Sequence, residues 1–120
     1  MMLDWSGYRQ QLIETIGKIA RLSPDTVKGY STLNAAGGKT NHLDAKTREL
    51  IALAVAVSLR CDGCITVHTD AAIKQGASRG EVAEALGVAV SVNAGAALVY
   101  SARVMDAYEV HTGSTDGATK

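Results

Sequence analysis

Two cysteines and a histidine form the strongest candidate in this chain for chemistry. Cys61 and Cys64 are separated by two residues, and His68 follows four residues after the second cysteine. On a helix these three positions are spaced i, i+3 and i+7, so they fall on one face. A cysteine attacks as its thiolate, yet a free thiol with a pKa of about 8.5 is mostly protonated at neutral pH. Because a neighbouring imidazole can take that proton, the spacing is typical of a redox-active dithiol.

The position of the pair at a helix start favours the same chemistry. We expect a helix over 60–76 that begins close to Cys61, where unpaired N–H groups and the positive end of the helix dipole stabilise a thiolate. Arg60 adds a positive charge beside it. The two cysteines could then cycle between dithiol and disulfide. Cys64 is closer than Cys61 to His68 in helical spacing, and we favour it as the activated thiol.

Two other interpretations of the cysteines stay open. Free cysteine is among the most buried residue types, so both could be inert core residues. A zinc site would need a fourth ligand, usually from a second cysteine or histidine pair. The other histidines, His42 and His111, are not paired in that way. We therefore expect no metal and no cofactor.

The elements that must position these side chains are all helical, because apolar residues recur at steps of three and four and no segment has the pattern of a strand. We expect an all-α bundle of about six helices, over residues 4–22, 24–36, 44–59, 60–76, 79–94 and 95–111, the last following or continuing the fifth. The glycines of 36–41 predict a loop.

Glu49 lies in the third of these helices, where a polar first turn gives way to an apolar remainder. A helix that is apolar all round is buried, so this helix is the candidate centre of the fold. A carboxylate at this boundary could be partly buried and suited to act as a general base. It could equally be an exposed carboxylate favoured by the helix dipole.

Length and charge limit the class of protein. A chain of 120 residues is enough for one domain, which we place at 1–111, with a disordered tail over 112–120. The 12 basic and 12 acidic residues form no basic run, which excludes a typical nucleic-acid binder. No secretory signal and no apolar stretch of membrane-spanning length is evident, so we expect a cytoplasmic protein. Small core side chains favour burial of further surface in an oligomer.

Residues 43–100 resemble the alkylhydroperoxidase D (AhpD)-like branch of the carboxymuconolactone decarboxylase family. The resemblance covers about half of the chain. It rests on three matching segments, which are Arg48-Glu49-Leu50, Cys61-x-x-Cys64-x-x-x-His68 and Gly76-Ala77-Ser78-x-x-Glu81-Val82-x-Glu84-Ala85.

The resemblance implies an AhpD-like helical bundle that assembles as a homo-oligomer, commonly a trimer or hexamer. It implies reduction of a small peroxide by the dithiol in antioxidant defence, or reduction of a partner's disulfide, with a thiol or protein electron donor. It also implies that Glu49 acts through His68 to deprotonate a cysteine. This sequence departs from some members of the family by carrying Gly63 where they have a second histidine between the cysteines.

Two rival functions remain at this stage. One is a carboxymuconolactone-type decarboxylase, which would use His68 and a basic group such as Arg48 for an anionic substrate. The family's decarboxylases generally lack the cysteine pair, which counts against this alternative. The other is a non-enzymatic redox-sensing oligomer whose disulfide alters its assembly.

Overall fold

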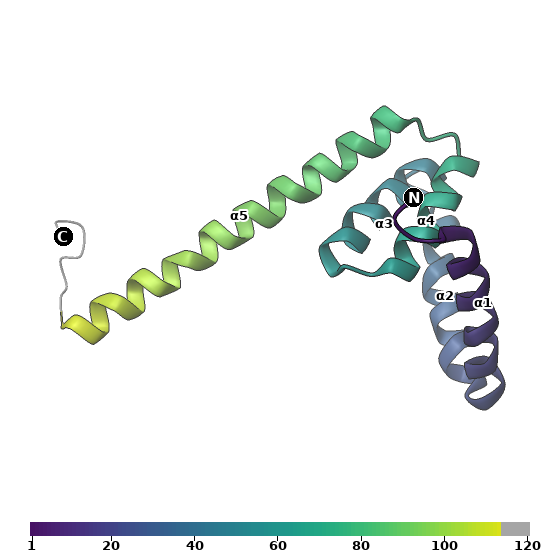
Figure 1. Ribbon diagram of the computed structural model, residues 1–120, viewed down its shortest axis with the longest axis horizontal. Helices are drawn as coiled ribbons and strands as arrows, with labels where there is room; N and C mark the ends of the chain where they lie inside the picture. The colour runs from purple at the N-terminus through teal and green to yellow at the C-terminus, as the bar shows by residue number, and fades with distance from the viewer. Residues whose placement is uncertain (114–120) are drawn as a thin grey trace.

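Five α-helices make up residues 1–113, the part of the chain that the computed structural model describes (Figure 1). No strand occurs within this part, so the predicted all-α class is confirmed. In chain order the helices are α1 (Trp5–Leu22), α2 (Pro24–Thr40), α3 (Ala45–Leu59), α4 (Asp62–Lys74) and α5 (Arg79–Thr112).

Helices α3 and α5 begin within one residue of the expected starts, 44 and 79, and each has a side-chain cap. The Asp44 carboxylate accepts a hydrogen bond of 2.8 Å from the N–H of Thr47 at the start of α3. At the start of α5, the Ser78 hydroxyl accepts from the N–H of Glu81, and the Glu81 carboxylate accepts from the N–H of Ser78. These bonds satisfy N–H groups that have no partner within the helix. They fix the ends of the two helices that flank α4 in the chain.

The predicted loop over 36–41 is wrong, because α2 continues to Thr40. Gly37 stands inside the helix at a close contact: a Cβ there would lie 2.7 Å from Cδ of Arg48 on α3. The glycine therefore permits a close approach rather than a turn. The helix ends at Thr40, four residues after the expected end at 36, and its cap residue Asn41 adopts the left-handed conformation with φ of 52°.

The two last segments expected, 79–94 and 95–111, form a single helix of 34 residues, so the final segment continues the fifth helix. Gly95 does not interrupt it, since one glycine costs a helix only about 1 kcal/mol relative to alanine. Thr112, expected in the tail, is its last residue, and Gly113 caps it with φ of 69°. The remainder of the predicted tail, 114–120, lies outside the described residues.

Helix α3 is the centre of the packing, as predicted. It packs against both α4 and α5, while α1 packs against α2 and α4. Leu53 and Ala56 of α3 are buried there. Its burial is one-sided, however, because Val55 remains 50% exposed and Leu59 70% exposed. The expectation that α3 is buried all round therefore does not hold within a single chain.

The protomer as a whole is open. Its radius of gyration is 20.2 Å, whereas a compact chain of this length has about 13–14 Å. Its accessible surface of 9303 Å² is about half as large again as the roughly 6,200 Å² of a compact protein of its mass. The cause is α5, which extends away from the other helices (Figure 1). By length and composition alone, this one helix of the described part could cross a membrane.

Candidate active site

The connection between α3 and α4 places Cys61 at the start of α4. The chain turns at Arg60, which has a left-handed φ of 54°. The N–H of Cys61 then donates to the carbonyl of Ala56 at 3.1 Å, which closes the end of α3. Cys61 is also the N-cap of α4, because its Sγ accepts a hydrogen bond of 3.2 Å from the N–H of Cys64. The predicted helix start close to Cys61 is confirmed.

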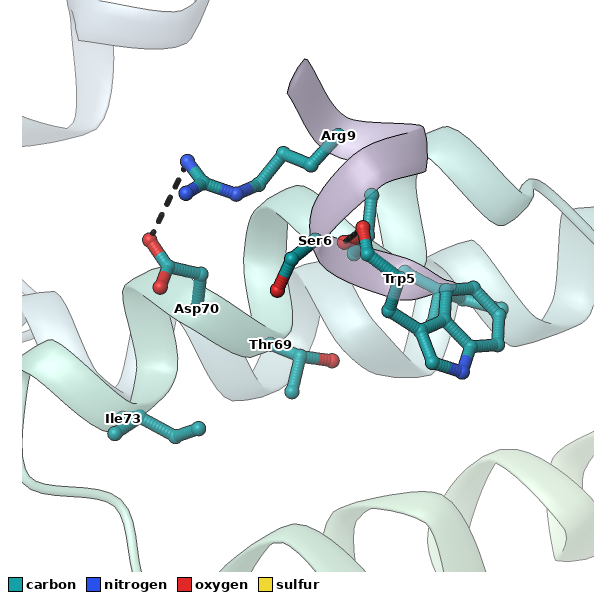
Figure 2. Close-up of a pocket in the computed structure, with 8 residues that line it drawn as sticks. Trp5, Ser6, Arg9, Thr69, Asp70 and Ile73 are labelled. Carbon is teal, nitrogen blue, oxygen red and sulfur yellow. Dashed lines mark hydrogen bonds and ion pairs between the residues drawn. The ribbon is translucent and has the colours of Figure 1, made fainter. Parts of the chain in front are cut away.

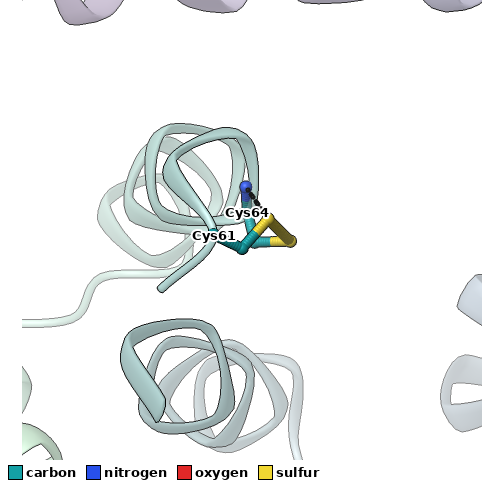
Figure 3. The surroundings of a disulfide bond; sticks show 2 residues. All are labelled: Cys61 and Cys64. Carbon is teal, nitrogen blue, oxygen red and sulfur yellow. Dashed lines mark hydrogen bonds between the residues drawn. A yellow bond between two sulfur atoms is a disulfide. The ribbon is translucent and has the colours of Figure 1, made fainter. Parts of the chain in front are cut away.

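The two cysteines are close enough to bond to each other. Their Cα atoms lie 5.3 Å apart, and the structure joins their sulfur atoms in a disulfide (Figure 3). This separation is within the usual range for disulfides. Neither side chain belongs to the fully buried core, since both are of intermediate exposure. The arrangement therefore differs from that of two inert, buried cysteines.

A carboxylate–imidazole pair links α3 to α4 beside the cysteines. The Nδ1 atom of His68 lies 2.7 Å from Oε2 of Glu49. Both side chains are largely covered, with exposed fractions of 19% for His68 and 25% for Glu49. A carboxylate bonded to one ring nitrogen orients an imidazole and fixes its tautomer. Glu49 is thus the partly buried carboxylate that its place in the sequence allowed.

A small cavity of about 260 Å³ brings His68 and Cys64 to one surface. Its lining residues are Ala52, Val55, Ala56, Leu59, Cys64 and His68. The wall supplied by α3 is wholly apolar, so the thiol and the imidazole are its polar groups. Of the two cysteines, Cys64 is the one that lines this cavity, in agreement with its closer spacing to His68.

Arg48 does not join this group, although it precedes Glu49 in the sequence. Its guanidinium donates to the carbonyl of Leu43 and, at 3.3 Å, to Oδ1 of Asn41. It therefore holds the connection between α2 and α3. Arg48 therefore has a structural role and does not take the anion-binding role considered above.

No feature of the sequence indicates that Leu12 of α1 packs against Gly63, between the cysteines. A Cβ added to Gly63 would lie 2.7 Å from Cδ2 of Leu12. A second long-range contact holds α1 in place, because the Thr66 hydroxyl donates to the carbonyl of Trp5 at 3.1 Å. Neither contact follows from a local pattern, since the partners lie far apart in the chain.

A larger cavity of about 440 Å³ lies on another side of α4, against the start of α1 (Figure 2). Asp70 at its edge forms ion pairs with Lys74 at 2.8 Å and with Arg9 at 3.8 Å. The hydrogen bond from Lys74 lowers the pKa of the Asp70 carboxyl below its usual value. Neither cysteine nor His68 lines this cavity, so it is separate from the candidate active site.

The fold and the site together define a small all-α protein with a cysteine pair at a helix start and a Glu–His pair beside it. Residues 24–107 match the sequence profile of the Carboxymuconolactone decarboxylase family. The chain belongs to that family.

Relatives in bacteria match most of the chain. A protein from Haemophilus influenzae is 47% identical over 110 residues, which span 92% of this chain and 97% of that protein. One from Paracoccus denitrificans, called uncharacterized protein 4 in cox locus, is 30% identical over 90 residues, spanning 75% and 81%.

Solved structures share the fold. A carboxymuconolactone decarboxylase family protein from Legionella pneumophila, crystallised in its apo form, is 37% identical, with a TM-score of 0.70 over 88% of this chain and 94% of that one. A protein from Methanobacterium thermoautotrophicum is 28% identical, with a TM-score of 0.66 over 72% and 97%.

Proposed function

We propose that the protein is a thiol-dependent peroxidase or disulfide oxidoreductase of antioxidant defence whose reactive group is the Cys61–Cys64 dithiol. The observation that carries this proposal is the 2.7 Å contact between Glu49 and His68, together with the cavity that His68 shares with Cys64. A dithiol beside an oriented imidazole has both the nucleophile and the base that thiol chemistry needs.

The proton path runs from Cys64 to His68. When Glu49 is ionised, its carboxylate accepts a hydrogen bond from Nδ1–H of His68, which leaves Nε2 free to accept a proton. Nε2 takes the thiol proton of Cys64, directly or through one water. The resulting imidazolium is stabilised by the carboxylate of Glu49. Glu49 is therefore a positioning residue that acts through His68.

The oxidative half of the cycle consumes one peroxide. The Cys64 thiolate attacks the terminal peroxide oxygen, the O–O bond breaks, and the leaving alkoxide takes the proton held by His68. Cys64 is now a sulfenic acid. The Cys61 sulfur attacks Sγ of Cys64, a disulfide forms, and water leaves. In total the dithiol loses two electrons and two protons, and the peroxide becomes an alcohol and water.

The reductive half of the cycle restores the dithiol. A thiol or a protein dithiol attacks the disulfide, and a second thiol of the donor resolves the mixed disulfide. The donor thereby loses the two electrons that the cysteines gain. Acting in reverse on a partner's disulfide, the same dithiol would serve as a disulfide reductase. Because this chain carries Gly63 where some family members have a second histidine between the cysteines, we propose the dithiol chemistry itself and not a high rate of peroxide reduction.

Lactone decarboxylation is the rival that the family name carries. The rival would need an anion-binding group near His68, and Arg48, the candidate from sequence, is bonded to the α2–α3 connection instead. The position of Cys64 in the same cavity as His68 favours the redox reaction. A non-enzymatic redox sensor would need the disulfide but no peroxide turnover.

We also propose that the protein works as a homo-oligomer, a trimer or hexamer, in the cytoplasm. The open protomer supports the assembly, because its surface exceeds that of a compact monomer by about 3,000 Å². The cytoplasm suits a dithiol that must be returned to its reduced form, since thiols are kept reduced there.

Peroxide consumption by the reduced protein, with and without each cysteine, tests the proposal. The wild-type protein is expected to lose two thiols for each peroxide consumed. Cys64→Ser is expected to abolish consumption, while Cys61→Ser is expected to stop at a sulfenic acid that dimedone traps. Thr69→Ser, a change on α4 outside the site cavity, is the matched control. Unchanged turnover in Cys64→Ser would contradict the proposal, and full lactone decarboxylation after both changes to serine would favour the rival.

A further inference from the structure

A second apolar groove, of about 410 Å³, lies between α3 and α5. Its lining residues are Ile51, Ala54, Val55, Ser58, Leu59, Val88, Ala89, Val92, Asn93 and Ala96. Val55 and Leu59 line both this groove and the cavity that holds Cys64 and His68. The groove and the candidate active site are therefore continuous along one side of α3.

We propose that the carboxyl-terminal half of α5 from a second copy of this chain, residues 94–112, lies in the α3–α5 groove and completes the wall of the Cys64 cavity. The proposal rests on the function proposed above for Cys64, but the place of the helix is tested independently of it. In a single chain the cavity has an apolar wall that faces solvent, and the second copy would cover that wall.

Beyond Ala96, which lines the groove, this half of α5 extends away from the other described helices of its own chain (Figure 1). Among the described residues of α5, Ala89 alone is buried. The large apolar side chains of residues 94–112 are 58–76% exposed, and these are Leu98, Val99, Tyr100, Val104, Met105, Tyr108 and Val110. A rigid helix of 34 residues spans about 51 Å, so its far end cannot fold back onto the groove of its own chain (Figure 1). A partner must supply the surface that these side chains need.

The surface that must be covered is the right size for a permanent complex. The protomer exposes about 3,000 Å² more than a compact monomer of its mass. Permanent homodimer interfaces bury about 2,000–5,000 Å² in total, which is about 1,000–2,500 Å² from each chain. An oligomer with more than one interface for each chain accounts for the excess.

The groove itself suits a closely packed apolar helix. Each of its polar side chains already has a hydrogen-bond partner, because Nδ2 of Asn93 donates to the Ser58 hydroxyl at 2.8 Å and to the carbonyl of Ala89 at 2.7 Å. A partner therefore leaves no side chain of the groove without a hydrogen bond when it excludes water. The run of small residues at 94–97 lets two helices approach closely, because interaxial distance depends on the side chains at the contact.

A lipid bilayer is a poorer occupant for α5 than a second copy. The uncharged part of α5 lies between Glu84 and Arg103, and Asn93 within it still bonds to Ser58 of α3. The uncharged segment beyond that bond, 94–102, is about 14 Å long. A membrane span needs about 30 Å.

Closure by a second copy has a chemical consequence at the site. Covering Val55 and Leu59 removes water from the cavity beside Cys64. Interactions between charged groups are stronger where water is excluded. The Glu49–His68 pair would then act on the thiol in a drier surrounding than a single protomer provides.

Photo-crosslinking between isotopically distinct chains tests the position of the helix. A benzophenone amino acid is placed at Leu59, or at Ala96 in a second variant, and the protein is mixed with ¹⁵N-labelled wild-type chain. Mass spectrometry is expected to find crosslinks between chains that map to 94–112. The matched control carries the probe at Ile73, 65% exposed on α4 and outside the groove, and is expected to give no crosslink to that segment.

Three results would overturn the proposal: sedimentation of the protein as a monomer, crosslinks between chains to residues 5–40 alone, or crosslinking only to lipid in added vesicles. None of these readouts depends on cysteine chemistry, so failure of the proposed redox function would leave the crosslinks in place. The link to the site is tested by mixing Leu98→Asp chains with Cys61→Ser/Cys64→Ser chains. The mixture is expected to consume peroxide faster than either variant alone. If crosslinks form but the mixture is no faster, the helix serves assembly and does not complete the site.

Discussion

Nδ1 of His68 contacts Oε2 of Glu49 at 2.7 Å across two helices, although 19 residues separate them in the chain. The tight connection at Arg60 and Cys61 makes this contact possible, because α4 begins as soon as α3 has ended. The same connection places Cys61 at the N-cap of α4. One turn of backbone thus sets both the carboxylate–imidazole pair and the position of the dithiol.

The contact between Gly63 and Leu12 predicts an unusual response to alanine. In most helix positions, Gly→Ala stabilises by up to about 1 kcal/mol. Gly63→Ala is expected to destabilise by about 1 kcal/mol instead, because the new Cβ meets Cδ2 of Leu12 at 2.7 Å. Urea denaturation at one fixed protein concentration measures the change.

The double variant Leu12→Ala/Gly63→Ala supplies the matching test, since removing Leu12 should remove the clash. The cost of Gly63→Ala is expected to vanish in that background. Gly29→Ala, where a Cβ meets nothing within 4 Å, serves as the control and is expected to stabilise. Equal effects of Gly63→Ala in both backgrounds would show that Leu12 does not limit the position.

The hydrogen bond from Thr66 to the carbonyl of Trp5 anchors α1 on α4. Thr66 is 8% exposed, so Thr66→Val keeps the shape and removes a buried hydroxyl that has a partner. The free energy of unfolding is expected to fall by about 1 kcal/mol. Thr69→Val, an exposed threonine on the same helix, is the control and should change little. A smaller effect at position 66 than at position 69 would contradict the anchoring role.

The ion pair between Lys46 and Glu81 at 2.7 Å joins the starts of α3 and α5. The hydrogen bond from Lys46 lowers the pKa of Glu81 below 4.5, and the bond to Glu81 raises the pKa of Lys46 above 10.5. A lowered acid pKa stabilises the fold above the unfolded-state value and loses that effect as the pH falls through the folded-state value. The raised lysine pKa stabilises below its unfolded-state value and loses that effect as the pH rises through the folded-state value.

Stability is therefore expected to fall at both ends of the pH range, and Glu81→Gln should flatten both slopes. Thermal denaturation from pH 3 to 5 and above pH 10 measures this. Glu84→Gln, an exposed neighbour on α5, is the control. An unchanged acid slope in Glu81→Gln would show that the pair does not contribute.

The sequence allowed the helical class and most helix starts to be predicted because these depend on local signals. The aspartate at position 44 and the Ser78–Glu81 capping box mark helix starts by their side-chain bonds alone. Glycine misled the prediction at Gly37 and left it open at Gly95, since the same residue serves a turn, a close contact or a plain helix position. Only the tertiary structure separates these uses.

The candidate site was predictable in part for the same reason. Cys61, Cys64 and His68 lie at the start of one helix or within it, so their spacing is visible in the chain. The sequence pattern left the role of Glu49 open, and the family resemblance assigned it. The Leu12–Gly63 contact depends on helices that meet only in the folded protein. The same is true of the cavity wall that Val55 and Leu59 form beside Cys64. No local pattern encodes such pairs.

The most direct test of the proposed relay is the rate of alkylation of Cys64 against pH in the reduced protein. The measurement is made in the wild-type chain, in Glu49→Gln and in the control Glu84→Gln, each with Cys61→Ser. The relay predicts that the Cys64 thiol in the wild-type and control chains has a midpoint of reactivity well below the value of about 8.5 for a free thiol. It predicts that Glu49→Gln moves this midpoint to higher pH and slows alkylation at neutral pH by about tenfold or more. Superimposable profiles in all three proteins would contradict the relay.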